Sequence, residues 1–205
     1  MGAGVFAPAS FVCKEWPISR IIKGMPRSPL ETPALRVLIE RQQVEQRIGE
    51  LAQMLADDYA GSAPLFIGLL NGAVQFMMAL MDRLPEELLA RLDYDFVDVS
   101  SYQGTENTGQ IELTKDLVVA VAGRDVLVVD GIVDTGRSLD FVMTMIESRK
   151  PLSLRACTLL NKPARREFPV PIDYCGFEIE DTFVVGYGMD CDQHYRALRH
   201  IAAIG

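Results

Sequence analysis

Residues 126–139 constrain the fold more than any other part of this chain. Residues 126–129 form an unbroken aliphatic run, which is typical of a strand buried on both faces of a parallel sheet. Apolar residues then recur every three or four positions, as on the buried face of a helix: Leu139, Val142, Met143 and Ile146. A strand, a turn and a helix in this order predict an α/β fold.

The turn between this strand and this helix is polar. Asp130 and Asp134 close the strand, and Thr135, Gly136, Arg137 and Ser138 lead into the helix. Free N–H groups and the dipole at a helix N-terminus favour an anion, and glycine lets the backbone approach it closely. We therefore expect a phosphate site. On its own, however, the turn is explained more simply as a strand–helix connection with Asp134 as the N-cap.

Composition sets limits on the class of protein. A chain of 205 residues with 49% hydrophobic residues fits one soluble domain with a sizeable core, and no apolar run is long enough to cross a membrane. The net charge of −8 argues against a general nucleic-acid binder but not against a small phosphorylated substrate. The four cysteines form no CxxC pair and the two histidines lack zinc-site spacing, so we expect reduced thiols in a cytoplasmic protein.

The first 33 residues differ from the rest of the chain. They contain five prolines and little periodicity, and they show no secretion signal. We expect a flexible N-terminal extension over residues 1–33 and a single domain over residues 34–205. Our hypothesis for the first 24 residues is that Met25 is the true start of translation and that they are either a gene-model artefact or a dispensable extension.

Periodicity predicts alternating elements along that domain. Helices are expected at 34–59 and 73–84, with a further helical turn or short helix at 85–92. Strands are expected at 64–70, 94–99, 153–160, 174–179 and 183–187, and a strand or hairpin at 111–121. The second of these helices should turn Val74, Met77, Met78 and Met81 inward. We expect loops at 100–109 and 161–171, and a C-terminus that is partly helical or extended. Alternation of this kind indicates a parallel sheet, whose ligands lie at the carboxyl ends of the strands.

The stretch from the aliphatic strand through Asp134-Thr-Gly-Arg-Ser-Leu139 resembles the phosphoribosyl diphosphate (PRPP) motif of type I phosphoribosyltransferases. The resemblance implies that residues 135–138 bind a 5′-phosphate and that Asp134 acts as general base. Asp130 would bind ribose, directly or through Mg²⁺. One position departs from the motif, because Gly131 stands where the family usually has a second acid. A lower affinity for PRPP is the expected consequence.

Two further stretches resemble the hypoxanthine-guanine branch of this family. Residues 68–76 resemble its pyrophosphate-binding loop, which implies a cis peptide at Leu70–Asn71 and pyrophosphate contacts from Leu70, Asn71 and Gly72. By itself Asn-Gly is a common hairpin turn, but a helical pattern follows it. Ser101 and Tyr102, with the loop up to Gly109, resemble a flexible lid that keeps water from the reaction centre.

The remaining matches concern the purine. Lys162 resembles the lysine that contacts the exocyclic oxygen, and an ammonium group, which only donates hydrogen bonds, suits a 6-oxo group rather than the amino group of adenine. Residues 175–190 resemble the C-terminal block of the family. By resemblance Phe183 stacks on the purine, Val184 and Asp190 contact it, Asp190 also holds Mg²⁺, and Arg196 binds pyrophosphate.

The resemblance runs from about residue 36 to the end and implies a type I phosphoribosyltransferase fold, with a central parallel sheet flanked by helices and a small hood formed by the terminal segments. It implies transfer of the phosphoribosyl group from PRPP to hypoxanthine and guanine, in a cytoplasmic homodimer or homotetramer that uses Mg²⁺. Three alternatives stay open: a xanthine-preferring or adenine-using relative, a non-catalytic nucleotide-sensing or RNA-binding relative, and an α/β domain with a phosphate site of unrelated use.

Overall fold

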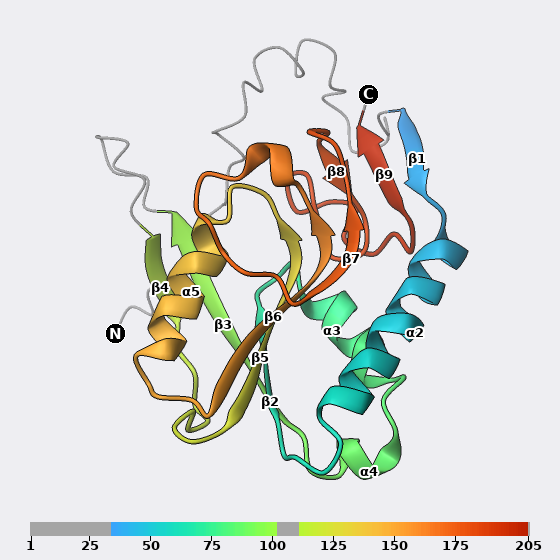
Figure 1. Ribbon diagram of the computed structural model, residues 1–205. Helices are drawn as coiled ribbons and strands as arrows, with labels where there is room; N and C mark the ends of the chain where they lie inside the picture. Colours follow the sequence, from blue (N-terminus) through green and yellow to red (C-terminus); the bar gives the residue numbers. More distant parts are fainter. Residues whose placement is uncertain (1–33, 102–110, 205) are drawn as a thin grey trace, which may run out of the picture.

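The computed structural model describes residues 34–101 and 111–204. Its central sheet has six strands in the order β4-β3-β2-β5-β6-β7 (Figure 1). In that order the strands are Ile111–Lys115, Asp93–Ser101, Leu65–Leu69, Asp125–Val133, Ser153–Asn161 and Tyr174–Glu178. Five of them run parallel, and β4 pairs antiparallel with β3 at one edge. The predicted α/β fold with a mostly parallel sheet is confirmed.

Helices cover both faces of this sheet, which explains the continuous aliphatic runs. Side chains of β5 alternate between the faces: Leu127 and Val129 pack with helices α2 (Arg41–Asp58) and α3 (Val74–Met81). Val126 and Val128 pack with α5 (Arg137–Glu147) on the other face (Figure 1). All residues of β2 are also buried. The central strands β2 and β5 therefore lie between two apolar layers.

The prediction of one helix over 34–59 was wrong at its start. Residues Leu35–Ile39 form strand β1, which pairs antiparallel with β9 (Ile201–Ile204). Leu35 and Leu38 have helical spacing, but pairing with a segment more than 160 residues away decides the conformation. Helix α2 begins only after Glu40, whose N–H donates to Gln43 Oε1 at 3.0 Å. Glutamate is an unusual N-cap, so the sequence gives little sign of this boundary.

A second sheet contains both ends of the described chain. Strand β9 lies between β1 and β8 (Val184–Val185) and pairs antiparallel with each (Figure 1). This sheet is the predicted hood. The C-terminus, which was expected to be partly helical or extended, forms strand β9 of this sheet. Because β8 follows directly after Phe183, the hood fixes the position of residues that line a cavity described below.

Three smaller expectations changed. Helix α3 buries Phe76, Met77, Leu80 and Met81, whereas Val74 and Met78 are only half-buried. Strand β4 ends at Lys115 rather than near residue 121. The reason is that the N–H groups of Val118 and Val119 donate to the carboxylate of Asp95 at 2.6 and 3.3 Å instead of extending the ladder. The basic loop expected at 161–171 contains the 3₁₀ turn η2 (Pro163–Arg165), whereas the short helix expected within 85–92 is confirmed as α4 (Glu86–Leu89).

Within the described ranges, we find no helix that has both the length and the apolar character needed to cross a membrane.

Candidate active site

Two adjoining cavities open at the carboxyl ends of the central strands. The small cavity, of about 200 Å³, surrounds the β5–α5 turn, and the large cavity, of about 890 Å³, extends from it toward the hood. Both are lined by the same five residues at their junction: Leu70, Gly72, Val99, Ile132 and Asp134. The two cavities therefore adjoin, and one ligand can extend from one into the other.

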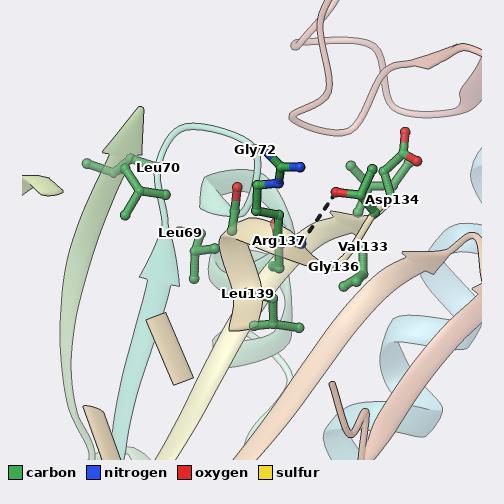
Figure 2. A pocket seen from close by; sticks show the side chains of 13 residues that line it. Leu69, Leu70, Gly72, Val133, Asp134, Gly136, Arg137 and Leu139 are labelled. Carbon is green, nitrogen blue, oxygen red and sulfur yellow. Dashed lines mark hydrogen bonds between the residues drawn. The ribbon is translucent and has the colours of Figure 1, made fainter. Parts of the chain in front are cut away.

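The small cavity presents the N-terminus of α5. Helix α5 begins at Arg137, and its N-cap is Gly136, with a φ of 87° and no capping side chain. A Cβ at Gly136 would lie 2.5 Å from the carbonyl oxygen of Phe168, so only glycine fits there. The simple interpretation of Asp134 as N-cap is therefore wrong. Figure 2 shows Asp134 and Arg137 above this turn and Leu139 below it; the dashed line is the 3.4 Å bond from the Arg137 N–H to Thr135 Oγ1.

Asp130 lines the floor of the small cavity. Part of its side chain reaches solvent, but burial of the carboxyl group raises its pKa to about 7, against the opposing effect of hydrogen bonds from the backbone amides of Ile132 and Gly131. A pKa near 7 leaves this carboxyl partly protonated at neutral pH, and a nearby cation would favour its ionised form.

Gly131 lies against the loop that follows β2. A Cβ at Gly131 would stand 2.6 Å from the carbonyl oxygen of Gly72, and one at Gly188 would stand 2.1 Å from the same atom. The two glycines therefore make a narrow seat for this carbonyl. The sequence suggested only that a carboxylate was missing at position 131, whereas the structure shows that backbone occupies the space.

The loop from Leu70 to Gly72 contacts both cavities. The Leu70–Asn71 peptide is cis, as predicted. The loop is held at both ends by backbone hydrogen bonds, from Leu70 N to Val97 O at 2.9 Å and from Ala73 N to Leu69 O at 3.0 Å. These two bonds therefore fix the position of the loop relative to β2 and β3.

The large cavity gathers all four residues that the resemblance assigned to the purine, together with Arg196, which it assigned to pyrophosphate. Lys162, Phe183, Val184, Asp190 and Arg196 all line it together with Asp134. Lys162 is 3% exposed, and its Nζ lies 3.5 Å from Asp134 Oδ2. A buried ammonium needs a partner of this kind, because an isolated charge is costly away from water.

Asp190 and Arg196 form an ion pair at the rim of the large cavity. The distance from Arg196 Nη2 to Asp190 Oδ1 is 2.7 Å, and Asp190 Oδ2 accepts the N–H of Gln193 at 2.8 Å. Arg196 also donates to the carbonyl oxygen of Gly188 at 2.7 Å. The residues between them thus form a closed turn next to the Gly72 carbonyl.

Arg165, which lines neither cavity but contacts Asp134, was not anticipated from the sequence. Its Nε donates to Asp134 Oδ1 at 2.8 Å. The sequence marked residues 161–171 as a basic loop but gave no sign of which arginine would reach Asp134. Ser101 ends β3, but its side chain, Tyr102 and the rest of the expected lid to Gly109 lie outside the residues that the structure describes.

The carboxylates of Asp130 and Asp190 suit a metal ion that binds together with a phosphorylated substrate. In the described part of the chain, no three His, Cys, Asp or Glu side chains group closely enough to hold a metal by themselves. Mg²⁺ is commonly held by one or two carboxylates together with substrate phosphates, and the separate positions of Asp130 and Asp190 fit that mode.

Comparison with known proteins gives a consistent result. A profile of the phosphoribosyl transferase domain matches residues 38–192. The hypoxanthine-guanine phosphoribosyltransferase of Bacillus subtilis is 38% identical over 170 residues, which cover 82% of this chain and 92% of that protein. The bifunctional protein TilS/HprT of Listeria monocytogenes is 42% identical over 170 residues, but the chain spans only 26% of its length.

The fold agrees with solved structures at the same level of similarity. The hypoxanthine phosphoribosyltransferase of Trypanosoma cruzi, in complex with the product IMP, superimposes with a TM-score of 0.77. The two sequences are 33% identical, and the match covers 88% of this chain and 98% of that one.

Proposed function

Because this chain belongs to the phosphoribosyl transferase family, we propose that it is a purine-salvage enzyme that transfers the 5-phosphoribosyl group from PRPP to hypoxanthine and guanine. The products are IMP or GMP and pyrophosphate. The observation that supports this most directly is the Lys162–Asp134 pair in the large cavity, 3.5 Å apart between Nζ and Oδ2.

This pair suits one edge of a 6-oxopurine. Lys162 donates a hydrogen bond to the 6-oxo group, and Asp134 accepts the proton on N7, the neighbouring atom of the same edge. Adenine presents an amino donor at position 6, which the ammonium group of Lys162 would oppose. Phe183 stacks on the ring, and Val184 and Asp190 contact its far side.

The small cavity binds the 5′-phosphate. Residues 135–138 surround it with backbone N–H groups at the N-terminus of α5, where the helix dipole favours an anion. Asp130 binds the ribose hydroxyls, and the backbone of residues 70–72 together with Arg196 binds pyrophosphate. Ser101 and Tyr102 form the lid of the site in this proposal.

The reaction exchanges one bond at C1 of the ribose for another. The bond to pyrophosphate breaks, positive charge develops on the sugar, and N9 of the purine attacks. Asp134 takes the N7 proton as general base, and its charge also stabilises the sugar cation. Asp130 and Asp190 would hold Mg²⁺, which would neutralise charge on the departing pyrophosphate.

A single assay tests this function. The protein is incubated with PRPP and Mg²⁺ and with hypoxanthine, guanine, xanthine or adenine in turn, and nucleotide formation is followed by absorbance. We expect IMP and GMP but no AMP. Turnover of xanthine alone would favour the xanthine-preferring alternative, and binding of IMP without turnover of any base would favour a nucleotide-sensing role.

We further propose a single domain over residues 34–205 that assembles as a homodimer or homotetramer in the cytoplasm.

A further inference from the structure

The basic loop after β6 packs over the β5–α5 turn. We call residues 162–168 the arginine loop. The Lys162 N–H donates to Val133 O at 3.0 Å, and the N–H groups of Glu167 and Phe168 donate to Thr135 O at 2.9 and 3.0 Å. The loop is therefore tied by its backbone to the residues on both sides of Asp134.

Side chains reinforce this attachment. Arg137 pairs with Glu167 at 3.5 Å, and its guanidinium lies 5.1 Å from the centre of the Phe168 ring. Arg166 donates to the side-chain oxygen of Asn161 and packs against Gly136. The arginine loop and the phosphate turn thus form one unit, and a side chain of the loop keeps a fixed position relative to Asp134.

Arg165 and Lys162 approach different oxygens of the same carboxylate. Arg165 Nε donates to Asp134 Oδ1 at 2.8 Å, while Lys162 Nζ lies 3.5 Å from Oδ2. Arg165 is also held from behind, because its Nη1 lies 3.7 Å from Asp181 Oδ2. A charge-assisted bond of normal length on one oxygen fixes the orientation of the carboxylate and directs the other oxygen toward Lys162.

We propose that Arg165 is a positioning residue for Asp134. By holding Oδ1, it keeps Oδ2 beside Lys162, so that the pair meets N7–H and the 6-oxo group of the purine together. Without Arg165, the carboxylate can turn both oxygens toward the Lys162 ammonium group, which removes the acceptor from the purine edge. This inference rests on the proposed function, because it assigns to Arg165 a role in that reaction.

The test compares steady-state kinetics of the wild type with those of Arg165→Met, Arg165→Lys and Arg149→Gln. Methionine keeps an unbranched stem without a donor, and lysine restores a cationic donor. Arg149 is the matched control, because it forms a 2.7 Å ion pair with Asp116 outside both cavities. Thermal unfolding of each variant shows whether its fold is kept.

We expect Arg165→Met to lower kcat about 10- to 100-fold, as misplacement of a catalytic group does, with the KM for PRPP changed by less than about threefold. Arg165→Lys should regain at least about a third of the lost activity on a logarithmic scale, and Arg149→Gln should match the wild type. A purely structural role would lower the unfolding midpoint of Arg165→Met and would not be rescued by lysine.

These measurements distinguish a failure of the proposed function from a failure of the positioning role of Arg165. If the wild type forms no IMP, the proposed function fails before Arg165 is tested. If the wild type is active and Arg165→Met has an unchanged or higher kcat, or loses efficiency only through KM, the positioning role is overturned.

Discussion

At the residue scale, charges with defined partners determine what the large cavity can bind. Lys162 has almost no contact with solvent, and its described ion pair is with Asp134, which also accepts a bond from Arg165. Removing the Asp134 charge leaves two cations without this partner but keeps the shape of the site. The substitution should therefore lower stability, because Lys162 loses a buried partner, and it should prevent proton transfer while the shape that binds IMP is kept.

We predict that Asp134→Asn lowers kcat at least about 100-fold, because an amide cannot accept the N7 proton as a base. The affinity for IMP, measured by calorimetry, should change much less. Asp140→Asn is the matched control, since Asp140 lies in the first turn of the same helix and lines neither cavity. Full activity of Asp134→Asn would refute its assignment as the base.

Gly131 gives a second prediction at this scale. A methyl group at position 131 would collide with the Gly72 carbonyl oxygen, 2.6 Å away, so the loop must move. Gly131→Ala should raise the KM for PRPP and weaken inhibition by pyrophosphate about tenfold or more, with little change in IMP affinity. Gly49→Ala is the control, because a Cβ at that position would meet no atom of the described residues within 4 Å outside its own helix. An unchanged KM for PRPP would show that the seat for this carbonyl is not needed.

Because the pKa of Asp130 is raised in the folded protein, we predict that the free energy of unfolding depends on pH. Burial raises the pKa of Asp130 to about 7, whereas in the unfolded chain an aspartate titrates near pH 4, so between about pH 4 and pH 7 the folded state binds more protons. This group therefore makes the free energy of unfolding fall as pH rises through that window. Urea unfolding of the metal-free protein at about pH 5 and about pH 8 measures the change.

Asp130→Asn should lose less stability than the wild type between these two pH values, by about 1 kcal/mol. The figure is modest because part of the side chain reaches solvent. Equal losses in the two proteins would contradict the raised pKa.

At the element scale, the hood connects the two ends of the described chain to the purine part of the site. Strand β9 pairs with β1 on one side and with β8 on the other, and Val184 of β8 lines the large cavity. Packing within the hood is therefore expected to affect base binding as well as stability.

Ile201 of β9 is fully buried and belongs to the core that includes α2 and Val184. We predict that Ile201→Ala lowers the free energy of unfolding by about 2–5 kcal/mol, because a large apolar side chain is removed from a packed core. The KM for hypoxanthine should rise more than the KM for PRPP. Denaturant unfolding and kinetics together test this, and a larger effect on PRPP would show that the hood does not position the base.

Elements with a strong local pattern could be predicted from the sequence. The aliphatic run of β5 and the periodic face of α5 were enough to predict the parallel sheet and the turn that lines the small cavity. Strand β1 could not be predicted, because its conformation depends on β9 at the other end of the chain. The contact from Arg165 to Asp134 was missed for a similar reason: it depends on how the arginine loop packs, and several basic residues in that loop look equivalent in sequence.

At the scale of the whole molecule, the fold brings distant segments to one edge of one sheet. The two cavities combine residues from the β2–α3 loop, the end of β5, the loop after β6 and the hood. The parallel arrangement explains why these segments meet, since the carboxyl ends of β2, β5 and β6 lie side by side. The central claim is that one ligand spans both cavities, with its phosphate at residues 135–138 and its purine at Lys162.

A crystal structure of the protein in complex with IMP tests this claim most directly. We predict that the phosphate lies on the backbone N–H groups of residues 135–138, with the 6-oxo oxygen within hydrogen-bond distance of Lys162 Nζ and N7 beside Asp134. IMP with its phosphate bound anywhere else, or with its purine turned so that the 6-oxo group faces away from Lys162, would contradict it.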